Sequence, residues 1–113
     1  MSVTRRRFAR VPVDLPAQYE VRGHPRWHSS SIINIGGGGV RLQTMEDIAE
    51  GTAISLRFDV EGTPIVATAR IVLSAFDRAK QCYFSSAAFM AIDLESQLRI
   101  EQRVLELRAS GTA

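Results

Sequence analysis

The chain contains one cysteine, one lysine and no long apolar run. The first and the last of these shortages each exclude a class of protein. A lone Cys82 cannot form an intrachain disulfide, which fits a reducing compartment and makes the cytoplasm the expected location. No segment approaches the ~20 apolar residues of a membrane-spanning helix, and no apolar segment follows the basic N-terminus as in a secretory signal. The 113 residues suffice for one core, so we expect a single domain over 1–113.

The scarcity of lysine makes arginine the informative cation. Thirteen of the fourteen basic residues are arginine, and four of them fall in the first ten residues, where there is no acid. These four are Arg5, Arg6, Arg7 and Arg10. The other 10 basic and 12 acidic residues leave the rest of the chain with a net charge of −2. Arginine pairs bidentately with phosphate or a guanine edge and stacks on flat rings. We therefore interpret residues 1–10 as a flexible arm that closes over a polyanion, with a solvated basic tail as the alternative.

Alternating apolar and polar residues predict six short strands. Their ranges are 11–21, 27–35, 40–42, 54–60, 65–73 and 82–92. Six strands followed by a segment of helical period predict an all-β fold, an antiparallel barrel or sandwich over 11–92 with a C-terminal α-helix over 93–108. Pro12 and Pro16 cannot donate ladder hydrogen bonds, so the first strand is expected to begin irregularly or to lie at an edge. Trp27, at the start of the second strand, is expected in the core, with an aromatic platform for a base as the alternative.

The apolar residues of the C-terminal helix fall on two neighbouring ridges. One ridge consists of Leu94, Leu98 and Leu105, and the other of Ile100, Val104 and Leu107. Because Glu101 interrupts this apolar face, we expect the helix to be only partly buried on the barrel.

A run of four glycines, Gly36 to Gly39, follows Asn34-Ile35 between two predicted strands. The plain interpretation is a flexible hairpin loop in which glycine supplies positive φ. The alternative is a backbone nest, in which amides without a neighbouring Cβ approach a phosphate or a base edge closely. The run is neither a P-loop nor a dinucleotide fingerprint, because no lysine follows it and Arg41 stands where the third glycine of a fingerprint belongs.

Side chains that carry catalysis or bind metals are not combined in a recognisable pattern. His24 and His28 flank a turn without further ligands nearby in sequence, so no metal site is predicted. No group of residues supplies a nucleophile, a base and an acid together. We predict that the protein is not an enzyme and has no cofactor.

Taken together, the arginines and the glycines match two motifs of a known family. The segment Arg6-Arg7-Phe8-Ala9-Arg10 has the form R-x-x-x-R, and Asn34-Ile35-Gly36-Gly37-Gly38-Gly39 is similar to (D/N)-x-S-x-x-G. Their order, their spacing of about two dozen residues and the strand between them resemble PilZ domains. An Ala-Arg-Ile-Val pattern over 69–72 and the closing helix extend the resemblance over nearly the whole chain. PilZ domains are β-barrels that serve bacteria as receptors for cyclic di-GMP, so the resemblance implies that fold and that ligand.

The resemblance also implies roles for individual residues. Arg6 and Arg10 would pair with the ligand's phosphates and guanine edges and stack on its purines. Asn34 would hydrogen-bond a guanine edge, Gly36 would stand in the loop beside the ligand, and Gly39 would permit a close backbone approach.

An arginine immediately before the first motif goes, in similar PilZ domains, with two mutually stacked ligand molecules. Arg5 therefore implies two cyclic di-GMP molecules per domain, with Arg5 and Arg7 as extra phosphate contacts. Gly36 departs from the motif because it replaces a serine. The loss of one hydroxyl contact is expected to weaken binding roughly three- to tenfold.

Three functions remain open on this basis. The leading interpretation is a cyclic di-GMP effector whose arginine arm becomes ordered on the ligand and which signals in trans to an unidentified protein partner. The second is a PilZ-like interaction module that has lost nucleotide binding, for which Gly36 is the main evidence. The third is a small nucleic-acid-binding barrel, which the mildly acidic body argues against.

Overall fold

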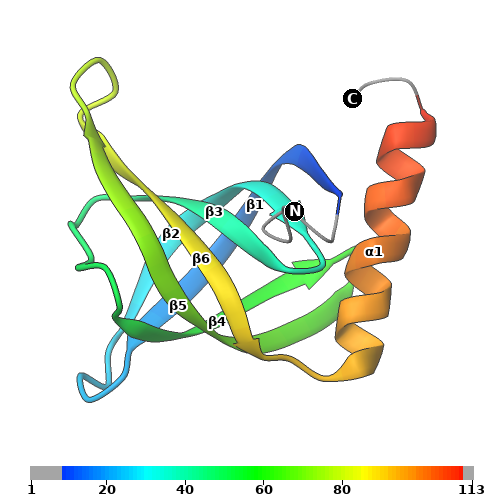
Figure 1. Cartoon of the computed structure of the whole chain (residues 1–113), viewed down its shortest axis with the longest axis horizontal. Helices are drawn as coiled ribbons and strands as arrows, with labels where there is room; N and C mark the ends of the chain where they lie inside the picture. The colour runs from blue at the N-terminus through cyan, green and yellow to red at the C-terminus, as the bar shows by residue number, and fades with distance from the viewer. Residues whose placement is uncertain (1–8, 111–113) are drawn as a thin grey trace, which may run out of the picture.

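The structure, a computed structural model, describes residues 9–110 as six strands and one helix (Figure 1). The elements are β1 (Arg10–Val21), β2 (Trp27–Gly36), β3 (Gly39–Thr44), β4 (Ala53–Val60), β5 (Thr63–Asp77), β6 (Cys82–Ala91) and α1 (Leu94–Ala109). The predicted number and order of the strands and the C-terminal helix are confirmed. The main difference is β5, which continues to Asp77 and forms with β6 a long hairpin that projects from the barrel.

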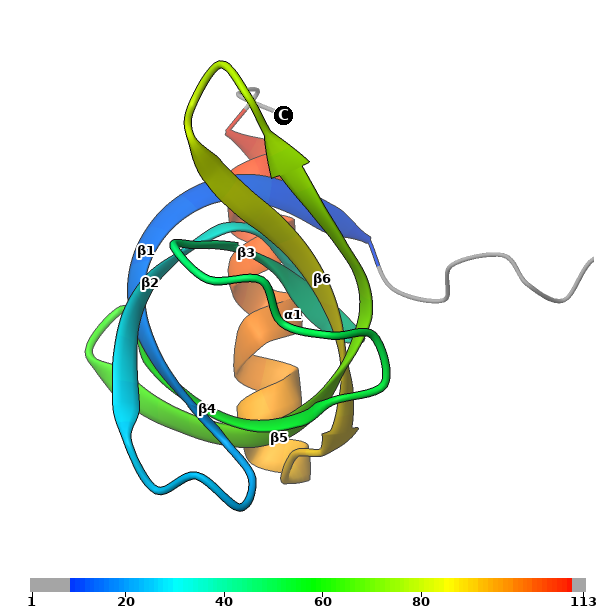
Figure 2. The same cartoon turned by 90° about the vertical axis from the view of Figure 1, so that its left-hand side faces the viewer.

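The strands form a closed antiparallel barrel in the order β1-β2-β3-β6-β5-β4. Figure 2 looks along the barrel and shows the ring of strands with α1 across its far end. Because β1 pairs with β2 on one side and β4 on the other, the expectation that it lies at an edge is wrong. The expected irregular start is confirmed, since the register with β2 shifts between Pro12 and Leu15. Pairing of β1 with β4 runs only from Ala17 to Val21.

The core fills the inside of the ring, as alternation of apolar and polar residues dictates. Every second residue of β4 is buried and its neighbours are more exposed, because successive side chains of a strand point to opposite faces. The largest fully buried aliphatic side chains come from five strands and the helix: Val11, Ile32, Val40, Leu42, Ile54, Leu56, Ile65, Ile71 and Ile100.

Helix α1 begins at an N-cap, Asp93, whose carboxylate accepts a hydrogen bond from the Ser96 amide at 2.8 Å. The helix is partly buried, as predicted, but only one of its two apolar ridges packs on the barrel. Ile100 and Val104 are 1% and 3% exposed, and Leu107 packs against the core beside them. The ridge of Leu94, Leu98 and Leu105 faces away from the barrel, with exposed fractions of 68%, 53% and 65%.

The expectation that Trp27 belongs to the core is wrong. Trp27 is half-buried on the outside of the barrel, with the Arg57 guanidinium 3.8 Å from its ring centroid. At the start of β2, near the β1–β2 turn, the ring is covered by this cation instead of by core side chains.

Truncation of the packed ridge should be costly and truncation of the outer ridge should not. We expect Ile100→Ala to lower the free energy of unfolding by about 2–5 kcal/mol, because it leaves a cavity between the helix and the barrel. Leu98→Ala, the matched control, should change it by less than about 0.5 kcal/mol. Urea unfolding followed by circular dichroism measures both values, and a larger loss for Leu98→Ala would contradict this assignment of the helix faces.

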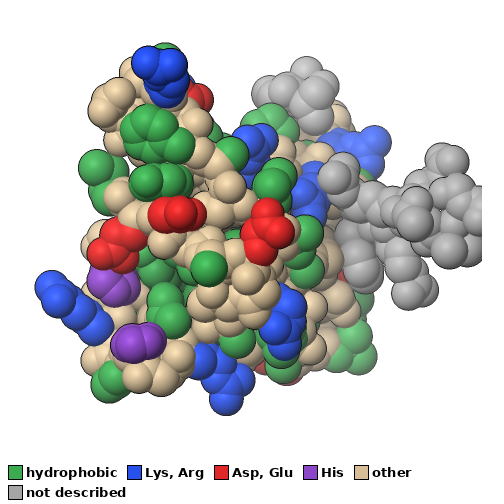
Figure 3. Space-filling view, turned by 60° about the vertical axis from the view of Figure 1, so that its left-hand side comes forward, with side chains coloured by type: hydrophobic (Ala, Val, Ile, Leu, Met, Phe, Trp, Pro, Cys, Tyr) green, Lys and Arg blue, Asp and Glu red, His purple; other side chains and the backbone are tan. Residues whose placement is uncertain are grey.

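A polar cluster lies near the end of β1 that is distant from α1. The Tyr19 hydroxyl donates to Glu46 Oε1 at 3.2 Å, and its ring stacks on that of His28 with centroids 5.1 Å apart. His28 Nδ1 lies 3.5 Å from the same Glu46 oxygen. Figure 3 shows acidic side chains on this face, one of them beside a histidine. Burial, and then the charge and hydrogen bond of Glu46, raise the pKa of Tyr19 to about 12.

This raised pKa predicts a pH dependence at the alkaline end. The folded state holds the Tyr19 proton more tightly than the unfolded state, so stability should fall as pH rises from about 10 to about 12. In Glu46→Gln the pKa of Tyr19 should move toward 10 without reaching it, because burial is the largest cause and remains. Ultraviolet titration of tyrosinate measures the shift, and an unchanged pKa in Glu46→Gln would contradict the role of this carboxylate.

Candidate ligand-binding site

Strand pairing brings the two sequence motifs together at one end of the barrel. Arg10, the last residue of the first motif, pairs with Gly36, and Pro12 pairs with Asn34. Gly36 in turn pairs with Gly39 across the β2–β3 turn. The predicted site residues Arg10, Asn34, Gly36 and Gly39 therefore lie side by side. The predicted contacts of Arg5, Arg6 and Arg7 lie outside the residues that the structure describes.

Gly36 and Gly39 lie where other backbone approaches too closely for a side chain. A Cβ on Gly36 would overlap the Ala9 carbonyl oxygen and lie 2.8 Å from Arg10 Cγ. A Cβ on Gly39 would overlap the Ala87 carbonyl oxygen. Neither glycine has the left-handed φ that the hairpin-loop interpretation supposes. The need for glycine at these two positions is therefore a need for space beside the protein's own backbone.

The two central glycines connect the strands, and hydrogen bonds hold both of their carbonyls. The Gly38 carbonyl accepts from the Phe89 amide of β6 at 2.9 Å. The Gly37 carbonyl accepts from Gln97 Nε2 of α1, also at 2.9 Å. Together with the close contacts of Ala9 and Ala87, these bonds restrain the turn from β6, from α1 and from the residue that precedes β1. The run forms the expected hairpin turn between β2 and β3, and these contacts tie it to other parts of the chain.

Asn34 carries an unsatisfied acceptor beside this turn. Among the residues that the structure describes, its Oδ1 is a buried side-chain oxygen with no hydrogen-bond partner. Such an atom costs about 1–3 kcal/mol relative to one that is hydrogen-bonded. Because the atom is buried, a ligand N–H donor could satisfy it only if the side chain moved.

The outer face beside Asn34 contains a cation that sequence reasoning did not single out as a ligand contact. Arg41 of β3 pairs with Asn34 on one side and with Ser86 of β6 on the other. It is exposed, and its guanidinium lies 5.2 Å from the centroid of the Phe84 ring. Its position two residues after Gly39 was the available signal, because i and i+2 lie on the same face of a strand.

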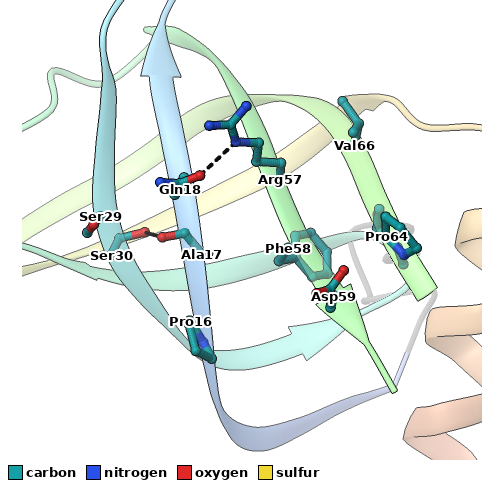
Figure 4. A pocket seen from close by; sticks show the side chains of 11 residues that line it. Pro16, Ala17, Gln18, Ser29, Ser30, Arg57, Phe58, Asp59, Pro64 and Val66 are labelled. Atoms are coloured by element: carbon teal, nitrogen blue, oxygen red, sulfur yellow. Dashed lines mark hydrogen bonds between the residues drawn. The ribbon is translucent and has the colours of Figure 1, made fainter. Parts of the chain in front are cut away.

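A hollow lies elsewhere on the barrel and shares no residue with either motif. It is open to solvent, has a volume of about 560 Å³ and lies where β1 and β4 diverge beyond Ala17 and Phe58. Figure 4 shows Arg57 and Gln18 above it, joined by a 2.7 Å hydrogen bond from Nε to Oε1. We assign this hollow no part in the motif site.

Comparison with protein families decides the assignment that the motifs suggest. The PilZ domain family matches residues 4–106, a range that contains both motifs. The chain belongs to the PilZ domain family. Comparison with curated proteins finds no match.

Solved structures similar to this PilZ domain share its fold at low sequence identity. MotI/DgrA, an inhibitor of motility from Bacillus subtilis, has a TM-score of 0.83 at 16% identity over 98% of this chain and 55% of that one. YcgR from Escherichia coli, solved in complex with c-di-GMP, has a TM-score of 0.77 at 12% identity over 95% and 47%. The K. pneumonia MrkH–c-di-GMP complex has a TM-score of 0.75 at 20% identity over 96% and 55%. The chain therefore spans about half the length of these three proteins.

Two further observations concern classes of site. Over residues 9–110, no helix of this PilZ domain has the length and apolar character needed to cross a membrane. In the same range, no three histidine, cysteine or acidic side chains are grouped as metal ligands would be.

The close approach at Gly36 predicts the effect of restoring the serine of the family motif. We expect Gly36→Ser to displace Ala9 and Arg10 and to lower the free energy of unfolding by about 1–3 kcal/mol, because the new side chain overlaps backbone. Gly62→Asn is the control: this glycine has a φ of 85° and open space around it, and asparagine tolerates that conformation. Thermal unfolding measures both variants. Equal or greater stability of Gly36→Ser would contradict the steric account.

Proposed function

We propose that this PilZ domain is a bacterial, cytoplasmic receptor for cyclic di-GMP that acts on a protein partner in trans and catalyses no reaction. The observation that carries the proposal is the pairing of Arg10 with Gly36. It places the last residue of the first ligand motif beside the glycine turn of the second. Membership of the PilZ family supports it. So do the similar folds of YcgR and MrkH, both solved with c-di-GMP.

The chemistry of the site fits a guanine dinucleotide. The unsatisfied Oδ1 of Asn34 would, once its side chain moved, offer an acceptor for a guanine N–H, and the outward-facing Arg41 adds positive charge to the same face. Arg6 and Arg10 would supply the forked donors that match phosphate oxygens and the O6 and N7 edge of guanine. In this proposal Arg5 and Arg7 hold a second, stacked ligand molecule through its phosphates.

The signal would be a change in the arginine arm. In this mechanism, the part of the arm that precedes β1 becomes ordered over the ligand, next to Arg10, which β1 already holds beside Gly36. The altered surface is what the partner recognises. The partner is a protein that the sequence does not identify.

Gly36 was the main support for the alternative of a module without a ligand. The overlap that a side chain there would make with Ala9 gives this glycine a structural reason that does not involve loss of binding. This favours the receptor over the interaction module. The mildly acidic body still argues against a nucleic-acid-binding barrel.

Calorimetric titration with cyclic di-GMP tests the proposal. We expect micromolar or tighter binding with a stoichiometry near two, and no binding in the Arg6→Ala/Arg10→Ala double variant. The matched control is Arg99→Ala/Arg108→Ala, which removes the same charge from exposed positions on α1 and should bind like the wild type. Replacement of Arg5 by leucine should reduce the stoichiometry to one.

The outcomes separate the three functions. An absence of heat, with an unshifted melting temperature at high ligand concentration, would favour the module without nucleotide. Binding that falls steeply with salt and is equal for cyclic di-GMP, GTP and single-stranded RNA would favour the nucleic-acid barrel. A wild-type stoichiometry near one would remove the role given to Arg5.

A further inference from the structure

The glycine turn between β2 and β3 is hydrogen-bonded to a residue of the C-terminal helix, and this residue belongs to neither motif. The Gln97 side chain donates from Nε2 to the Gly37 carbonyl at 2.9 Å, across 60 positions of sequence. The bond is partly buried, and the same carbonyl belongs to the turn that connects Gly36 to Gly39. We propose that Gln97 is a positioning residue for the cyclic di-GMP site and that it couples occupancy of this site to helix α1. This inference rests on the proposed function.

Gln97 is held in place by the packing of its own helix. Ile100 and Val104 lie three and seven positions further on, which puts them on the same helix face as Gln97, and both are buried against the barrel. The backbone N–H of Gln97 also donates to the Asp93 carbonyl at 3.0 Å, which closes the first helical turn after the N-cap. The helix can therefore neither rotate nor slide freely without breaking the bond to Gly37.

The turn is equally restrained on its other side. Its Gly38 carbonyl accepts a hydrogen bond from the Phe89 amide, and the Ala9 carbonyl is in close contact with Gly36. Figure 1 shows the turn between β2 and β3 ending beside α1. A ligand that binds Asn34 and the glycine amides would contact a backbone segment that is hydrogen-bonded to the helix. A shift of this segment would therefore also displace Gln97.

Binding and helix order are then linked in both directions. If the bond between Gln97 and Gly37 aligns the turn for the ligand, bound ligand must stabilise that bond by the same factor. Ligand should therefore reduce opening of the N-terminal half of α1. Loss of the Gln97 donor should weaken ligand binding.

The test compares two variants of Gln97 with the same changes at Gln102, an exposed position on the same helix. Gln97→Met removes the donor with little change in shape, and Gln97→Glu places a carboxylate against the Gly37 carbonyl. We expect cyclic di-GMP affinity at pH 7 to fall roughly three- to tenfold in Gln97→Met, the effect of one lost hydrogen bond, and further in Gln97→Glu. Gln102→Met and Gln102→Glu should bind like the wild type.

Two readouts distinguish positioning from a general loss of structure. A protonated glutamic acid can donate where a carboxylate cannot, so the affinity of Gln97→Glu should recover relative to wild type between pH 7 and pH 4.5, while that of Gln97→Met should not. In hydrogen exchange, ligand should slow the amides of residues 94–104 in the wild type and in Gln102→Met, but not in Gln97→Met.

Failure of this inference can be told apart from failure of the proposed function. If the wild type binds cyclic di-GMP and Gln97→Met binds equally well with the same protection of α1, the coupling is wrong and the receptor stands. If the wild type does not bind, the receptor is wrong, and the coupling to a cyclic di-GMP site falls with it. In that case the claim that Gln97 positions the turn can still be tested in the free protein by the NMR amide resonances of Gly38 and Gly39. These resonances should shift more in Gln97→Met than in Gln102→Met. Equal shifts would show that Gln97 does not position the turn.

Discussion

The structure of the site depends on backbone approaching backbone at Gly36 and Gly39. At these two positions the carbonyls of Ala9 and Ala87 occupy the space that a Cβ would need. A side chain at either position would have to displace a strand or the start of β1. The location of Arg10 beside Gly36, and of β6 beside Gly39, is thus tied to the absence of a side chain at these two positions.

This constraint also shows which parts of the molecule were predictable from sequence. The strands were predictable because a half-buried strand alternates, and each strand of a barrel has one face toward the core. The meeting of the two motifs was predictable only through the family resemblance. The bonds that restrain the glycine turn were not predictable, because they join residues 51 and 60 positions apart through contacts that no local pattern records.

The faces of helix α1 illustrate a second kind of limit. Two ridges of similar hydrophobicity were available, and the sequence does not indicate which one the barrel end accepts. The structure selects Ile100 and Val104, and the alternative ridge of leucines remains exposed. Trp27 was misjudged for a related reason: burial depends on where the strand enters the barrel, and at the start of β2 the ring is covered by Arg57.

Closure of the barrel has a consequence for when the site exists during folding. The β1–β2 pairing, which brings the two motifs together, and the β2–β3 pairing both join strands that are neighbours in sequence. The Gly38 and Gly39 contacts to β6 and the Gly37 contact to α1 form only when distant parts of the chain meet, and such non-local contacts are slow to form. A nascent or partly unfolded chain thus lacks the complete site. A ligand that required this site would bind only folded molecules and would stabilise them by a free energy that grows with the logarithm of its concentration.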